Sequence, residues 1–229
     1  MSKGFFVTGT DTGVGKTLIT AGLLCALGRR GIKVAGMKPV ACGCKQTKQG
    51  LRNEDALLLE EHTTVDIEYD IINPYAYEPP VSPHFAATVC GRPIRLDTII
   101  QRFRQIEEVT DRVIVEGVGG WRVPINDEQD ISEVAIILKL PVILVVGLRL
   151  GCINHALLTA KAVQEGGLNV IACVASLIDP EYQNVEGTLI TLEKRLKVTV
   201  DLVPWKSNCQ PEQITHYLKQ TTRKIYETV

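Results

Sequence analysis

Short runs of β-branched, apolar residues alternate along this chain with longer segments whose apolar positions recur at helical spacing. The short runs predict strands at residues 4–8, 34–38, 112–116, 142–146, 170–175 and 198–202. The longer segments predict helices at residues 16–30, 53–61, 96–107, 131–138, 153–166, 185–196 and 211–226. Because strands and helices alternate, the pattern predicts an α/β fold, with a mostly parallel sheet and helices on both faces.

Length and composition predict one domain over residues 1–229. With 229 residues and 45% hydrophobic content, the chain can bury one sizeable core but not two large catalytic domains. The proline-rich segment 70–91 does not suit a continuous helix and predicts a long, ordered loop. Loops of that length are often functional.

Charge and patterning exclude several partner classes. The net charge of −1 and the lack of a dense Lys/Arg run argue against nucleic acid. No apolar run approaches the roughly 18 residues of a membrane span, and the N-terminus enters a strand without a leader, which predicts a cytoplasmic protein. The seven cysteines are odd in number and scattered, so we expect reduced thiols without a disulfide. The four histidines lack metal-pair spacing, which favours structural roles.

The strongest motif follows the first predicted strand, which runs into Gly9-Thr10-Asp11-Thr12-Gly13-Val14-Gly15-Lys16-Thr17. In such a phosphate-binding loop, backbone N–H groups and a helix N-terminus surround phosphate oxygens. Lys16 would reach the β- and γ-phosphates, and the Thr17 hydroxyl would ligate Mg²⁺. The loop is one residue longer than the usual pattern. The motif predicts a P-loop NTPase-like fold that binds a nucleotide.

Ligands of parallel sheets bind at the carboxyl ends of the strands, where two further charged residues stand. Lys38 follows an apolar run and is either a second cation for a reacting anion or a solvated lysine. Glu116 follows a buried run and precedes glycines, which suits a Mg²⁺ ligand. Asp55, taken alone, is more typical of the first turn of a helix.

Taken together, these residues resemble the dethiobiotin synthetase family, and the resemblance runs almost end to end. Its motifs are Val7 to Thr17, Gly36-Met37-Lys38-Pro39-Val40, Gly50 to Ala56, Asn73-Pro74-Tyr75, Ser82-Pro83-His84, Val115 to Trp121, Pro141 to Gly147 and Leu150 to His155. The resemblance implies carboxylation of 7,8-diaminopelargonate (7,8-diaminononanoate) with CO₂ and ring closure with ATP and Mg²⁺. The products would be dethiobiotin, ADP and phosphate, formed through a carbamate and a carbamic-phosphoric anhydride in the penultimate step of biotin biosynthesis, without an organic cofactor.

The resemblance also assigns roles. Lys38, Lys16 and Thr12 would be catalytic, and Thr17, Asp55 and Glu116 would hold Mg²⁺. The nucleotide would bind at Gly13, Val14, Gly15, Lys16, Thr17, Asp55, Glu116, Gly117, Val118, Gly119, Ser176, Leu177, Pro204, Trp205 and Lys206. The substrate would bind at Thr12, Lys38, Cys42, Gly151, Cys152, Ile153 and Asn154. The last four begin a helix that would hold the substrate carboxylate across a homodimer interface.

Two positions depart from the family pattern. Cys42 stands where many members have serine, which puts a substrate contact in doubt. Ser176 stands where the family usually has the asparagine that contacts adenine, so we expect a relaxed preference among nucleotides.

A partition-type P-loop ATPase switch is the alternative. It would carry a second lysine at the loop position of Asp11, and that reversed charge argues against it.

Overall fold

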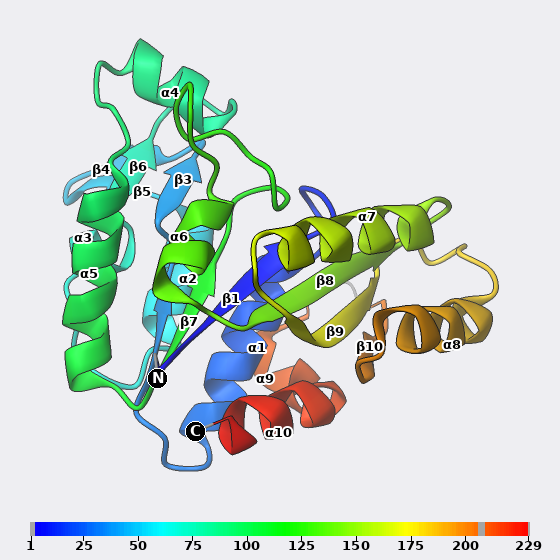
Figure 1. Ribbon diagram of the computed structural model, residues 1–229. Helices are drawn as coiled ribbons and strands as arrows, with labels where there is room; N and C mark the ends of the chain where they lie inside the picture. Colours follow the sequence, from blue (N-terminus) through cyan, green and yellow to red (C-terminus); the bar gives the residue numbers. More distant parts are fainter. Residues whose placement is uncertain (1–2, 206–208, 229) are drawn as a thin grey trace.

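A computed structural model describes residues 3–205 and 209–228 of the chain. Over these ranges the main sheet has six strands, all parallel, in the order β10-β9-β8-β1-β7-β2 (Figure 1). They are β1 (Gly4–Gly9), β2 (Val34–Met37), β7 (Arg112–Glu116), β8 (Val142–Leu148), β9 (Val170–Leu177) and β10 (Val200–Val203). The predicted α/β fold with a parallel sheet is therefore confirmed.

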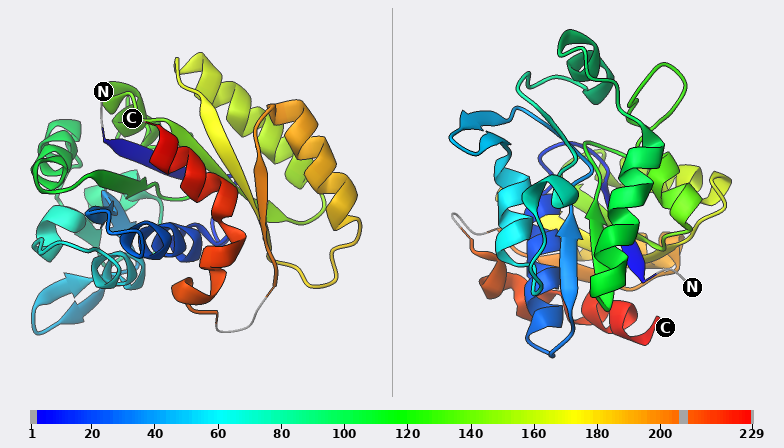
Figure 2. Two further views of the ribbon diagram at one scale, coloured as in Figure 1. Left: turned by 90° about the horizontal axis from the view of Figure 1, so that it is seen from below. Right: turned by 90° about the vertical axis from the view of Figure 1, so that its left-hand side faces the viewer.

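Alternation along the strands places apolar side chains on both faces of the sheet. In β1, Phe5 and Val7 join one core cluster, and Phe6 joins the other. Helices cover both faces, as Figure 2 shows. One layer contains α1 (Lys16–Gly28), α2 (Glu54–Glu61), α9 (Pro211–Ile214) and α10 (Lys219–Glu227). The other contains α5 (Leu96–Val109), α6 (Ser132–Leu138), α7 (Cys152–Glu165) and α8 (Val185–Leu196).

Between β2 and α5 the chain builds an extension above the sheet edge that the sequence only partly predicts (Figure 1). It contains β3 (Val40–Cys42), β4 (Lys45–Thr47), β5 (Gly50–Arg52), α3 (Tyr69–Ile72), β6 (Tyr75–Tyr77) and α4 (Pro83–Val89). Strand β3 pairs in parallel with β6, and β4 pairs antiparallel with β5. The expected loop at 70–91 thus includes a strand and a helix.

The prediction of a single C-terminal helix at residues 211–226 is wrong. The chain forms α9, then a 3₁₀ turn (Thr215–Tyr217), and then α10 after a break at Leu218. The break lets Leu218 and Ile214 both pack against Gly22, where an added Cβ would lie 2.8 Å from Ile214. The Asp201 carboxylate accepts the N–H of Thr221 at 2.8 Å, which satisfies a free donor at the start of α10.

Within the described part of the chain, none of the helices has both the length and the apolar character that crossing a membrane requires.

Candidate active site

The phosphate-binding loop joins β1 to α1 in a conformation that requires glycine at two positions. Gly13 has φ 73° and Gly15, which precedes α1, has φ 91°. The Lys16 ammonium donates to the Asp11 carbonyl at 2.8 Å and is almost fully buried. Burial, followed by the nearby Lys38, lowers the pKa of Lys16 to about 8. An anion such as a phosphate beside this lysine would raise its pKa again.

Asp11, in the phosphate-binding loop, contacts both its own loop and a distant segment. Its carboxylate accepts the Thr12 N–H at 2.7 Å and forms an ion pair with Arg149, just after β8. The Thr12 N–H, together with Arg149, holds the pKa of Asp11 below its usual value. These contacts tie the loop to the segment that leads into α7.

Lys38 is the centre of a cluster of charged groups at the carboxyl ends of β2 and β7. Its Nζ lies 2.5 Å from Glu116 Oε1, 3.0 Å from Asp55 Oδ2 and 3.4 Å from the Gly117 carbonyl. The Thr17 hydroxyl donates to the same Glu116 oxygen at 2.9 Å. Because β2 and β7 are neighbours in the sheet, their ends bring these residues together.

The cluster remains charged despite its burial. Burial lowers the pKa of Lys38, but Glu116 and Asp55 outweigh it, so the pKa is raised. Burial likewise raises the pKa of Asp55, but Lys38 outweighs it, so that pKa is lowered. An ammonium and two carboxylates therefore lie beside the phosphate-binding loop.

The donor set of this cluster fits Mg²⁺, which prefers oxygen ligands. Glu116 Oε2 is fully buried and has no hydrogen-bond partner among the described residues. The Thr17 hydroxyl points to the same carboxylate, and the Asp55 side chain is 43% exposed. These three residues could hold the ion while leaving room for water.

A cavity of about 860 Å³ opens beside the loop and the cluster. Among the residues predicted from the sequence, it is lined by Thr12, Gly13, Gly15, Lys16, Thr17, Lys38, Cys42, Asp55, Glu116, Val118 and Gly119. Gly117, another predicted residue, contacts the cluster through its carbonyl, which accepts a hydrogen bond from the Lys38 ammonium. The thiol of Cys42 is half-buried, and burial raises its pKa to about 11.

The cavity also includes residues that the sequence reasoning missed. Asn53 lies at the N-cap of α2, and its Oδ1 accepts the N–H groups of Asp55 and Ala56 at 3.0 and 3.3 Å. These bonds hold the backbone at the start of α2, from which the Asp55 side chain contacts Lys38. The signal for Asn53 in the sequence is a capping residue just before an acidic first turn. Residues 80–83 of the proline-rich segment also line the cavity.

Several predicted nucleotide contacts lie away from the cavity. Val14 packs in the core beside Gly147. Ser176 is the last residue but one of β9, and its Oγ lies 2.9 Å from where a Cβ on Gly15 would be. Leu177 packs on α8, and Trp205 is half exposed after Pro204. Lys206 lies outside the described residues.

The predicted substrate-carboxylate segment begins α7, also outside the cavity of this single chain. Gly151 has φ 91° and no side chain caps the helix, so its first N–H groups lack a side-chain acceptor. The Cys152 side chain is buried, with Sγ 3.9 Å from the Tyr182 hydroxyl. Ile153 is half-buried and Asn154 is exposed.

Comparisons of sequence identify close relatives. A family model described as an AAA domain matches residues 3–213. An ATP-dependent dethiobiotin synthetase BioD from Xanthomonas axonopodis pv. citri is 43% identical over 216 residues, covering 94% of this chain and 96% of the relative. The protein of the same name from Cellvibrio japonicus is 42% identical over 220 residues and 96% of both chains.

Solved structures with the same fold include cell-division and partition-type ATPases. The MinD cell division protein of Aquifex aeolicus superposes with a TM-score of 0.61 at 17% identity, over 100% of this chain and 98% of that one. A ParA family ATPase from Chlorobium tepidum gives 0.57 at 15% identity, over 98% and 97%. At such low identity these similarities show the fold alone, and they confirm that it is P-loop NTPase-like.

Proposed function

The chain belongs to the family of ATP-dependent dethiobiotin synthetases, and we propose on this basis that it carboxylates 7,8-diaminopelargonate with CO₂ and closes the ring of dethiobiotin, using ATP. The observation that carries the proposal is the contact of Lys38 with Glu116 and Asp55 beside the phosphate-binding loop. That arrangement places two lysines and two carboxylates around one cavity.

The reaction brings two anions together, the carbamate and the γ-phosphate, and the cationic side chains of the cavity reduce the repulsion between them. A carbamate and a γ-phosphate repel by roughly 4 kcal/mol per pair of unit charges at 4 Å and an effective dielectric of 20. Lys16 and Lys38 line the same cavity, so both can offset this repulsion. The carbamate oxygen then attacks the γ-phosphorus as ADP leaves. The second amine attacks the carbonyl carbon of the mixed anhydride, phosphate leaves, and the amine loses its proton.

Different residues of this chain bind the phosphates, the carbamate and the metal ion. The backbone of Gly13 to Thr17 binds the phosphates, Lys16 orients them, and Thr12 contacts the reacting amine or the carbamate. Thr17, Asp55 and Glu116 would hold Mg²⁺, which supplies positive charge to phosphate oxygens when bound. Lys38 binds the carbamate. Its pairing with Glu116 keeps it protonated before the substrates arrive.

The far carboxylate of the substrate binds at Gly151 to Asn154 of a second subunit. Support comes from the N-terminus of α7, where no side chain caps the first turn and the helix dipole favours an anion. A test is to mix Lys38→Gln subunits with subunits altered at Asn154. Random mixing gives half heterodimers with one intact site each, hence roughly a quarter of wild-type activity if sites are shared. Activity that stays at the level of the two variants alone contradicts sharing.

We propose that the base binds beside Ser176, Leu177, Pro204 and Trp205, with Lys206, which lies outside the described residues, as a further contact, and that the preference among nucleotides is relaxed. A serine hydroxyl cannot present the paired donor and acceptor of an asparagine amide. Turnover that is similar with ATP, CTP and GTP supports this proposal, and strict dependence on ATP contradicts it.

We also propose a cytoplasmic location, which the odd number and scattered positions of the cysteines support.

The experiment that tests the function is phosphate release from MgATP, with and without 7,8-diaminopelargonate and bicarbonate, with the product identified by mass. Release that needs both substrates, yields dethiobiotin and collapses in Lys38→Gln supports the proposal. Release that ignores both substrates favours a partition-type ATPase switch instead.

A further inference from the structure

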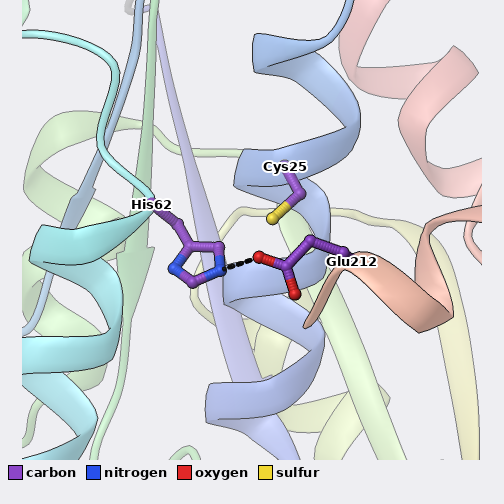
Figure 3. A group of neighbouring side chains, drawn as sticks. All are labelled: Cys25, His62 and Glu212. Atoms are coloured by element: carbon purple, nitrogen blue, oxygen red, sulfur yellow. Dashed lines mark hydrogen bonds and ion pairs between the residues drawn. The ribbon is translucent and has the colours of Figure 1, made fainter. Parts of the chain in front are cut away.

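A second group of reactive side chains lies away from the cavity, between α1, the end of α2 and the start of α9. Figure 3 shows Cys25, His62 and Glu212 pointing toward one another from these three helices. The Cys25 Sγ, one His62 ring nitrogen and one Glu212 carboxylate oxygen lie within 4.8 Å of one another. No other group of three or more metal-ligating residues of this kind occurs in the described ranges. None of the three lines the cavity.

The contacts of His62 turn one ring nitrogen toward a backbone carbonyl and the other toward the Glu212 carboxylate. Its Nδ1 lies 3.0 Å from the Leu58 carbonyl, which can only accept, so Nδ1 carries a proton. Its Nε2 lies 3.0 Å from Glu212 Oε1. In a neutral ring with Nδ1–H, Nε2 is an acceptor facing a second acceptor. The contact therefore requires either a proton or a metal ion between the two atoms.

The Leu58 contact also has the form seen at metal sites. Histidine ligands usually donate the other ring N–H to a backbone carbonyl or a carboxylate, which fixes the tautomer and aims the lone pair at the metal. The His62 side chain is only 6% exposed, so its orientation is held by the protein.

Cys25 supplies the softest ligand of the group. Its thiol is half-buried on α1, and burial, followed by the charge of Glu212, raises its pKa to about 11. A thiol in this environment is a poor free nucleophile, so a redox or nucleophilic role is disfavoured. Charges around the thiol come from Glu212 and Glu61, which oppose that of Arg29. Arg29 itself donates to the Thr215 hydroxyl at 2.9 Å.

We propose that Cys25, His62 and Glu212 form a site for a borderline transition-metal ion, Zn²⁺ in particular, with water as the fourth ligand. Sulfur and imidazole nitrogen select Zn²⁺ over Mg²⁺. At Zn–ligand distances of about 2.0–2.3 Å, tetrahedral ligand atoms lie about 3.3–3.7 Å apart, so side-chain shifts of about 1 Å complete the site. The Glu212 side chain is 49% exposed and leaves a path for the ion and the water.

The ion would join three helices of one layer. α1 begins at the phosphate-binding loop, α2 carries Asp55 in its first turn, and α9 follows the segment predicted to surround the base. Binding to the folded state alone raises Tm, and the rise grows with the logarithm of the free metal concentration once that concentration exceeds Kd. For a chain of this size we expect a rise of about 5–10 °C when free Zn²⁺ exceeds its Kd by 100-fold.

The test is Co²⁺ and Zn²⁺ binding to the full chain after treatment with a chelator. Co²⁺ bound at this site gives a thiolate-to-cobalt charge-transfer band and visible d–d bands, which Zn²⁺ abolishes by displacement. Cys25→Ser should eliminate the charge-transfer band. Cys42→Ser, which removes the thiol nearest the nucleotide site, and Cys90→Ser, on an exposed cysteine, should keep it.

Glu212→Gln provides a second variant that does not threaten folding, because its side chain is half exposed. It should weaken Co²⁺ binding roughly tenfold or more and remove the Zn²⁺-dependent rise in Tm. Circular dichroism of each apo variant checks the fold. No charge-transfer band in the wild type, or a band that survives Cys25→Ser, overturns the proposal and leaves the group as a His62–Glu212 ion pair.

Discussion

The substitution Lys38→Gln tests the reasoning on the active site most directly. Glutamine keeps a hydrogen-bond donor and much of the side-chain length, but it removes the charge that contacts Glu116 and Asp55. The Glu116 side chain is fully buried, so it cannot turn to water once the ammonium is gone. Both stability and catalysis should therefore fall.

The magnitudes follow from burial and contact. Removing one partner of a buried ion pair costs about 3–5 kcal/mol, and one hydrogen bond retained by the glutamine amide returns about 1 kcal/mol. The expected loss in the free energy of unfolding is about 2–4 kcal/mol, which lowers Tm by about 5–15 °C at this chain length. Losing a cation aimed at developing negative charge lowers kcat by about 10²–10³.

The assay combines thermal unfolding of the free protein with steady-state phosphate release. The matched control is Lys45→Gln, because Lys45 and Glu54 also form a close ion pair, but both side chains are more than three-quarters exposed. That pair should contribute less than about 1 kcal/mol. If Lys38→Gln keeps kcat within tenfold of the wild type, or unfolds at the wild-type Tm, the reasoning about the buried cluster is refuted.

Three further predictions concern packing, specificity and pH. Gly4→Ala should lose about 1–3 kcal/mol of stability in denaturant titrations, because its Cβ would lie 2.6 Å from Phe103. An unchanged midpoint contradicts this. Ser176→Asn should raise the ratio of kcat/KM for ATP over CTP by about tenfold, and an unchanged ratio argues against contact with the base. Burial raises the pKa of Asp201 despite the N–H groups of Thr221 and Gln220, so its contribution to stability is lost as pH rises through the folded pKa. Asp201→Asn should therefore gain Tm relative to the wild type between pH 4 and pH 7, and a constant difference refutes the sign.

The sequence predicts the sheet and the phosphate-binding loop well because both depend on local signals. Apolar runs, helical spacing and the glycines at positions 13 and 15 are sufficient to place β1 and α1. The sequence does not show that β2 and β7 are neighbours, but Lys38 and Glu116 could be placed at the carboxyl edge of the sheet because each stands at the end of an apolar run. Their direct contact needed the structure. Sequence spacing gives no distance between side chains.

Other features depend on tertiary packing and could not be predicted. At the break, Ile214 of α9 and Leu218 itself both pack against Gly22 on α1, which leaves room for their side chains. The group of Cys25, His62 and Glu212 is spread over most of the chain and meets only through the stacking of three helices. The sequence indicates that Asn53 is a helix cap, but it does not show that the cap holds the backbone of Asp55 beside the cavity.

The central place of β1 governs the order in which this protein can assemble on the ribosome. β1 is synthesised long before its neighbours β7 and β8, which begin only at Arg112 and Val142. At about 5–20 residues per second, β1 waits roughly 7–27 seconds for its second neighbour. During that time its apolar side chains are exposed to chaperones, and its unpaired backbone N–H and C=O groups can pair with the wrong strand. Nucleotide cannot stabilise the nascent chain early, because the loop that would bind it has no supporting sheet until well over half of the protein has emerged.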